Sequence, residues 1–539
     1  MGCRKGIGER VGRRTILSGF GTAGAIGLAG CITAENGHGA TETDPPELIQ
    51  RGFEAADVEA PFETTIYANA ENDERSRWAQ LVQHELNETG LFEVDFERLE
   101  WGSYEQLCLN MADNEENCLI TLDISGGWDP HTYVNLLFHS DHRSPNGFNF
   151  NHYTDGRTDD LIDSGLAESD PERRVEIYRE LQDRLATQVP ISIVRSGEET
   201  TIYRCDAVDD WRQYPLPGSE YEAVYAPYGG EYLESEDGAE FVVDLPATVS
   251  NPDPIRMNDT TSSMATTPIY EGLLAVDFEG TVRPWLATDW EQLDPTSYRF
   301  ELRAGVEFHN GETLGAEHVR ATFERYAGTP REPDVYDWYD ETVVIDETEL
   351  EIHLSREYGP FEASVGIPIV PLAASEGELS LSENPVGTGP YRFDEYADGE
   401  YWRLQRFDDH WFDGDETVPA RPPVETITMR IITDSAARRA ALEAGELDLA
   451  TQVPAEDVVD LAAESEYCVE RSAAGSVDFL VYPTYLEPFA NADVRRGIDG
   501  LLPRETIVDV VYAGLGTVAS TPIPPLLEEY AVDGIDTDR

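Results

Sequence analysis

Residues 299–326 read "RFELRAGVEFHNGETLGAEHVRATFERY" and combine the features of a strand, a tight turn and a helix. Apolar residues alternate with polar ones around its start, which predicts a half-buried strand: Tyr298, Phe300 and Leu302. Asn310-Gly311 predicts a tight turn. Val319 and Phe323 lie on one face of the predicted helix that follows, which we expect to be capped near Thr313. None of these side chains indicates catalysis, so the meaning of the stretch depends on the rest of the chain.

The composition is that of a large and very acidic folded protein. The 539 residues are too many for one hydrophobic core and predict two or three domains. Acidic residues number 106 against 38 basic ones, which gives a formal net charge of −68, and the only lysine is Lys5. Because the acids are scattered among aromatic and periodic apolar positions, the chain is expected to fold.

The net charge indicates a protein adapted to high salt. Self-repulsion would strain the folded state in dilute buffer, but at molar salt the Debye length falls to about 3 Å and the repulsion is screened. The alternative is an acidic secreted protein from a low-salt source, and the absence of lysine after Lys5 argues against it. Nucleic acid and anionic membrane surfaces are excluded as partners of the acidic folded part of the chain, because phosphate binding needs a basic patch.

The N-terminal segment predicts export and lipidation. Residues 12–31 read "GRRTILSGFGTAGAIGLAGC". This segment is too short and too glycine-rich to be a favourable membrane-spanning helix, so it is interpreted as a processed signal. Arg13-Arg14 resembles a twin-arginine export signal, and the end of the segment resembles a lipobox in which Cys31 is lipidated. An ordinary N-terminal helix is the alternative. We expect residues 1–31 to be the signal and residues 32–43 a polar tether, so the protein would sit on the extracellular face of the membrane and touch it only through the lipid.

Four cysteines follow the signal, and outside the cytosol they are able to pair: Cys108, Cys118, Cys205 and Cys468. Two disulfides and four free buried thiols are both compatible with the sequence.

Signatures of enzymes and cofactors are absent. The chain has no HExxH, GxSxG, GxxxxGK or CxxC motif. The glycines of "NPVGTGPYRF" at 384–393 precede a proline and a predicted hairpin, whereas a phosphate site needs backbone N–H groups at the start of a helix. Four histidines between His131 and His152 favour a solvated loop over a metal site. Acidic pairs occur throughout, so no pair can be singled out for glycosidase chemistry, and we expect no cofactor and no metal.

Several stretches resemble the extracellular solute-binding proteins of family 5, which feed peptides, nickel or oligosaccharides to ABC importers. They cover 241–539 in the order of the family's first half: "IYEGLLAVDFEGTVRPWLATDWEQLDPTSYRFELRAGVEFHNGETL" at 269–314, "NPVGTGPYRF" at 384–393, "RIITDSAARRAALEAGELDL" at 430–449 and "ADVRRGIDGLLPRETIVDVVYAG" at 492–514.

The family's second half lies in front of its first. The stretches that resemble it are residues 62–101, "GGWDPHTYVNLLFHS" at 126–140 and "DPERRVEIYRELQDRLATQVPISIV" at 170–194. In the last of these, Asp170 and Pro171 predict a helix start, and the predicted apolar face is Val175, Tyr178, Leu181 and Leu185. The order indicates a circular permutation, with the acidic linker 228–240 joining the family's old ends. A natural permutation and a rearranged gene both account for it.

The resemblance implies an α/β, two-lobed fold of the periplasmic-binding-protein type (type II) that closes on its ligand by hinge motion. One lobe would comprise residues 206–483 with a subdomain near 290–385. The other would be split between 44–205 and 484–539, with hinges near Cys205 and Tyr482.

The resemblance also implies a function without catalysis. A monomer would capture a solute and present it to a permease with ATPase subunits, and the family's ligand contacts correspond to Trp128, Asp129, Thr261, Ser262, Ser263 and Met264. The family's peptide binders carry an aspartate between the tryptophan and the Asp-Pro pair, and "GGWDP" lacks it. Asp123 or Asp129 would have to replace it, or the solute is a sugar, a metal chelate or another small molecule. Rival classes are a secreted acidic hydrolase of glycans and a binding protein with no transporter, and the six residues would then be ordinary loop and core residues.

Overall fold

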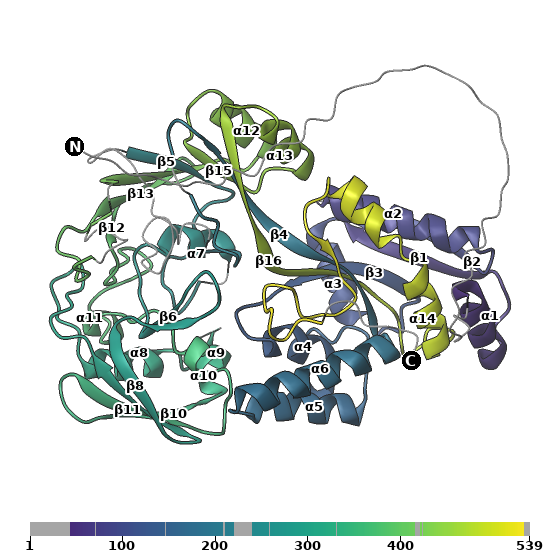
Figure 1. The fold of residues 1–539 in the computed structure, drawn as a ribbon, viewed down its shortest axis with the longest axis horizontal. Helices are drawn as coiled ribbons and strands as arrows, with labels where there is room; N and C mark the ends of the chain where they lie inside the picture. The colour runs from purple at the N-terminus through teal and green to yellow at the C-terminus, as the bar shows by residue number, and fades with distance from the viewer. Residues whose placement is uncertain are drawn as a thin grey trace, which may run out of the picture. The chain divides into compact units, whose positions relative to one another are not determined.

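A seven-stranded mixed sheet brings the front of the chain together with its back (Figure 1). The computed structural model describes residues 44–70, 72–145, 147–208, 211–219, 240–257, 259–329, 331–414, 421–422 and 424–532. The strand order is β15-β4-β16-β3-β1-β2, and β17 pairs with β4. The strands are β1 (Phe62–Asn69), β2 (Phe92–Leu99), β3 (Cys118–Ser125), β4 (Ile191–Arg204), β15 (Leu449–Thr451), β16 (Tyr467–Val481) and β17 (Thr517–Val518).

Helices cover both faces of this sheet. Strands β1, β2 and β3 pair in parallel, and parallel strands are usually buried on both faces. On one face, Leu119 of β3 belongs to a core that includes residues of α1 (Pro45–Ala56), α2 (Asp73–Glu88) and α14 (Ala492–Leu501). On the other face, Ile120 belongs to a core that includes residues of α3 (Trp101–Asn110), α4 (His131–Phe138), α5 (Gly156–Ala167) and α6 (Pro171–Gln188). The predicted α/β class is confirmed.

Helix α6 begins as predicted, but its buried face differs by one residue. Asp170 is the N-cap, and its side chain accepts a hydrogen bond from the backbone N–H of Arg173. Val175 is only half-buried, so its predicted place in the apolar face was wrong. The neighbouring Arg174 is buried instead, because its charge is met by Asp129.

Three smaller sheets surround a large core that runs from Tyr203 to Leu449, which we call the large core. The first sheet has the order β10-β11-β9-β8, the second β12-β13-β14-β5, and the third pairs β6 with β7. Their strands are β5 (Glu240–Leu245), β6 (Leu274–Val276), β7 (Val282–Pro284), β8 (Ala287–Asp294), β9 (Ser297–Leu302), β10 (Tyr339–Val344), β11 (Glu349–Leu354), β12 (Tyr391–Ala397), β13 (Tyr401–Arg406) and β14 (Thr426–Ile431). The predicted hairpin after "NPVGTGPYRF" is confirmed as β12 and β13.

The stretch at 299–326 folds almost as predicted. It contributes most of β9, in which Phe300 is fully buried, and Gly311 adopts the left-handed φ of +85° that its turn requires. Helix α8 (Ala316–Arg325) starts after Gly315, so the cap predicted near Thr313 was wrong. The remaining helical segments are α7 (Thr260–Thr266), α9 (Glu332–Tyr336), α10 (Phe361–Ser364), α11 (Leu372–Ser375), α12 (Ser435–Glu443), α13 (Ala455–Ala462), α15 (Arg504–Thr506), a 3-10 turn (Ser140–His142) and a π-helical turn (Ile507–Val511).

The long antiparallel strands β4 and β16 connect the seven-stranded sheet to the large core (Figure 1). Just past the end of β4, Cys205 forms a disulfide with Cys468 of β16. Cys108 and Cys118 are free and buried, and burial raises the pKa of each thiol to about 12. The four cysteines therefore make one disulfide rather than two or none.

The signal, the tether and Cys31 lie outside the described residues. Among the helices that the structure describes, none is long and apolar enough to cross a membrane.

Candidate functional site

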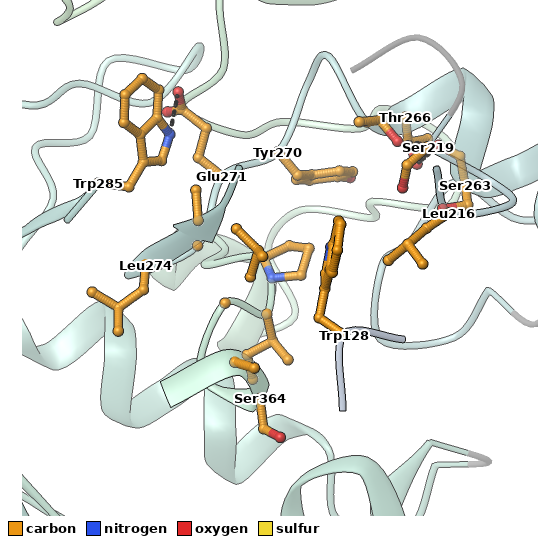
Figure 2. Close-up of a pocket in the computed structure, with 18 of the residues that line it drawn as sticks. Trp128, Leu216, Ser219, Ser263, Thr266, Tyr270, Glu271, Leu274, Trp285 and Ser364 are labelled. Carbon is orange, nitrogen blue, oxygen red and sulfur yellow. Dashed lines mark hydrogen bonds between the residues drawn. The ribbon is translucent and has the colours of Figure 1, made fainter. Parts of the chain in front are cut away.

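A cavity of about 390 Å³ lies beside the indole of Trp128 (Figure 2). Trp128 comes from the loop between β3 and α4, whereas the other lining residues fall between 214 and 368. Those labelled in Figure 2 are Leu216, Ser219, Ser263, Thr266, Tyr270, Glu271, Leu274, Trp285 and Ser364. The cavity is therefore built by residues near the large core and completed by one side chain from the loop that follows β3.

Glycines and backbone hydrogen bonds fix the loop that carries Trp128. The N–H of Gly126 donates to the carbonyl of Gly475 in β16 at 2.8 Å, and a Cβ on Gly126 would lie 2.6 Å from both Thr132 and Tyr133. The indole N–H of Trp128 donates to the Tyr214 hydroxyl at 2.8 Å. Because its polar atom is satisfied, the half-buried indole is free to offer an apolar face to a solute.

Asp129 is a structural residue in this arrangement. Its two carboxylate oxygens accept hydrogen bonds from Arg174 at 2.7 and 2.9 Å, and both side chains are buried. One of the oxygens also accepts the N–H of His131 at 2.9 Å, and burial lowers the pKa of His131 to about 4. A carboxylate engaged in this way has little left to offer a ligand. Trp128 therefore lines the cavity, whereas its neighbour Asp129 is engaged in contacts within the protein.

Only one of the four candidates on α7 lines the cavity. Ser263 does so, whereas Met264 is fully buried in the large core. Ser262 donates to the Asp259 carboxylate at 2.8 Å and accepts the N–H of Ser250, so it holds the helix start in place. Thr261 is buried and does not line this cavity. Of the six predicted residues, the structure brings Trp128 and Ser263 to one cavity.

Two charged residues that the sequence analysis did not single out also line the cavity. Glu271 accepts hydrogen bonds from Trp285 (3.1 Å), Thr388 (2.6 Å), His410 (3.0 Å) and Trp411 (2.9 Å), and its side chain is 1% exposed. Arg331 forms an ion pair with Asp334 at 2.7 Å and donates to the carbonyl of Pro254 at 2.8 Å. An acid within the apolar run "IYEGLL" was the available signal for Glu271.

A second cavity of about 650 Å³ also contacts Trp128. Its lining includes Arg212, Gln213, Phe278, Gly280, residues 470–473 of β16 and residues 525–530. The indole packs against Gly280, where a Cβ would lie 2.7 Å from the ring. Trp128 therefore contributes a wall to both cavities.

The described residues hold no group of three or more histidines, cysteines or acids with the geometry of a metal site. The strand pairing of β3 with β16 does place two acids opposite each other, Asp123 and Asp478. Each forms an ion pair with an arginine, Asp123 with Arg75 and Asp478 with Arg195. Both acids are therefore engaged in structural pairs, and neither lines the two cavities described above.

Parts of the chain are similar in sequence to known solute-binding proteins. Residues 281–538 match the sequence model of the bacterial extracellular solute-binding proteins, family 5 Middle. The match supports the predicted family. The chain is 28% identical over 296 residues to the glutathione-binding protein GsiB of Escherichia coli O1:K1, covering 53% of this chain and 56% of the relative. GsiB of Salmonella paratyphi A is 27% identical over 292 residues, with the same coverage. The chain thus spans about half the length of the curated relatives it matches.

Two solved structures that resemble part of this chain are named as periplasmic binding proteins. DppA from Helicobacter pylori, in complex with the peptide STSA, is 25% identical with a TM-score of 0.39, and the match covers 43% of this chain and 50% of that one. AgaA from A. tumefaciens R10, in complex with agropinic acid, is 24% identical with a TM-score of 0.39, and the match covers 42% and 46% of the two chains.

Proposed function

We propose that the protein is the solute-binding component of an ABC importer and that it captures a peptide-like or other small oligomeric solute without chemical change. The observation that carries this proposal is Trp128, which lies in the loop after β3 of the seven-stranded sheet and lines a cavity built by the large core. The Trp128 indole adds an apolar wall to a cavity that is otherwise lined by residues 214–368, as expected of a site that encloses its solute. The partial family match and the relatives named glutathione-binding protein support the same role.

The site would close by motion of two lobes about β4 and β16. One lobe is residues 206–483, with its subdomain near 290–385, and the other is 44–205 with 484–539. The pairing of β4 with β16 is irregular between Ala473 and Val477 and again between Asp478 and Phe479, and such irregularities bend a strand locally. Away from the hinge, the N–H of Gly359 donates to the carbonyl of Leu166 at 2.7 Å, and opening of the lobes would break this hydrogen bond.

A circular permutation accounts for the order of the segments. The front strands β1, β2 and β3 complete a sheet with β16 and β17, and α1 packs on α14 from the end of the chain. A chain that carries residues 240–532 first and 44–219 second should fold and bind like the original. Failure of this rearranged chain to fold in molar salt would contradict the proposal.

Export by the twin-arginine route and a lipid on Cys31 would hold the protein outside the cell, next to its permease and ATPase subunits. Cys31→Ser should release the folded protein into the medium. Membrane retention of this variant would contradict the anchor.

The decisive test of the function is mass spectrometry of the small molecules that co-purify with the protein from its native medium at high salt. The proposal predicts one bound solute that is recovered unchanged after incubation. Conversion of the solute by the purified protein would overturn the proposal in favour of an enzyme.

A further inference from the structure

The wall of the 390 Å³ cavity has charged residues, but its charges are already balanced by the protein. A carboxylate offers about four acceptor positions, and four donors from the side chains of Trp285, Thr388, His410 and Trp411 use those of Glu271. The dashed line in Figure 2 marks one of these bonds and shows the carboxylate directed toward Trp285. Glu271 therefore has no acceptor to spare for a ligand ammonium group.

The one cation among the described lining residues is balanced as well. Arg331 is paired with Asp334 at 2.7 Å, and it also donates to a backbone carbonyl. A ligand carboxylate would have to share the charge of this cation with an existing carboxylate. Neither sign of charge on a solute therefore finds an unpaired counter-charge among the described residues of the wall.

Uncharged groups make up the rest of the lining. Apolar surface comes from residues such as Leu216, Leu274 and Trp128, and hydroxyl groups come from Ser219 and Ser263. Figure 2 shows both serines on the same side of the Trp128 indole. Within the described part of the chain, neither serine hydroxyl makes a hydrogen bond to another residue, so both are available to a ligand.

We propose that this cavity takes a neutral portion of the solute, one with an apolar face and hydroxyl or amide groups and without an ammonium or carboxylate group. The inference rests on the proposed function and narrows its substrate class. Burying a charge without a partner is far more costly than burying a hydrogen-bonded neutral group. An oligosaccharide or a peptide segment without its charged ends has the required chemistry.

The test compares matched neutral and charged probes in molar salt. The first pair of pools contains tetrapeptides with neutral side chains. In one pool the ends are acetylated and amidated, and in the other pool the ends are free and charged. The second pair contains neutral oligosaccharides or the same oligosaccharides with one amino sugar. Protein stripped of its bound solute is incubated with each pool, and retained molecules are identified by mass spectrometry. The proposal predicts retention of neutral members, with at least about tenfold weaker affinity for their charged counterparts.

A charge-introducing variant sharpens the result. Ser263→Asp would place a carboxylate beside Trp128 and should shift the preference toward the probes that carry an ammonium group. Ser380→Asp is the matched control, because Ser380 is exposed and lines neither cavity. It should leave the preference for neutral probes unchanged.

Equal or tighter binding of the charged probes to the parent protein would overturn the proposal, and so would retention from none of the pools. The proposed function is tested separately by the co-purified solute. A solute that is bound through a charged group in the cavity would refute this inference and leave the function standing.

Discussion

At the scale of single residues, a local motif predicts a position better than it predicts a role. The Trp-Asp-Pro stretch was expected to contact the ligand, and in the structure Trp128 lines the cavity. It could not reveal the role of Asp129, because the partner Arg174 lies 45 residues further along the chain. Ser262 and Met264 show the same limit, since a short helix has one side toward the cavity and another toward the core.

Asp129→Asn should destabilise the protein by about 3 kcal/mol or more, because it leaves the buried charge of Arg174 without its partner. The free energy of unfolding, measured by denaturant titration in molar salt, checks this. Glu168→Gln is the control, because Glu168 pairs with Arg173, whose side chain is 72% exposed, and such a pair contributes about 1 kcal/mol or less. Equal effects of the two substitutions would contradict the structural role of Asp129.

At the scale of elements, periodicity and turn signals predicted the strand at 297–302, the hairpin after 390 and helix α6. They could not predict which elements meet. Strand β5 belongs to one sheet and β15 to another, yet the carboxylate of Asp244 accepts the N–H of Thr451 at 2.8 Å and links the two. Such pairings depend on the whole fold, and no local pattern in either strand indicates the other.

Asp244 should make the stability depend on pH. Burial raises its pKa from the usual 3.8 to about 6. Below about pH 4 the carboxyl group is protonated in both states, whereas between the two values it ionises only in the unfolded chain. Its contribution to stability therefore falls as the pH rises to about 6.

Asp244→Asn removes this titration. Relative to the parent, the variant should gain about 3 kcal/mol of stability between pH 4 and pH 7. Unfolding titrations of both proteins at the two pH values check this, and the other acids cancel in the comparison. A difference that stays constant with pH would show that Asp244 ionises normally in the folded protein.

The disulfide beside β4 and β16 should stabilise the fold. Cys205 and Cys468 are separated by 263 residues, and closing a long loop restricts the unfolded chain. The variant with serine at both positions should lose about 2–4 kcal/mol, measured as a lower unfolding midpoint at the same salt concentration. Treating that variant with reductant is the control and should cause no further loss. An unchanged midpoint in the double variant would contradict this contribution.

At the scale of the whole molecule, composition and the order of motifs were the informative signals. The order of the family-like stretches predicted that residues 44–205 and 484–539 belong to one lobe, and in the structure α1 packs on α14. The cavity itself could not be predicted, because its lining is assembled from segments as far apart as Trp128 and Pro368. The net charge of −68 belongs to this scale too, since it acts through the field of the entire protein.

The charge predicts cooperative folding in molar salt and loss of structure in dilute buffer, because screening of the acids is required for a compact state. Thermal unfolding followed by circular dichroism between 0.1 and 3 M potassium chloride checks this prediction. Sucrose is the control, since it favours compact states without screening charge and should not replace the salt. The same unfolding midpoint at all salt concentrations would contradict the inference.

Calorimetric titration of the co-purified solute shows whether the solute binds against Trp128. Trp128→Ala should weaken binding by about 2 kcal/mol, near thirtyfold, because an aromatic wall of the site is lost. Trp101→Ala removes an indole that is 49% exposed and does not line either cavity, and it should bind like the parent. If Trp128→Ala keeps the parent's affinity while its thermal stability is unaltered, the solute binds elsewhere and Trp128 is not part of its site.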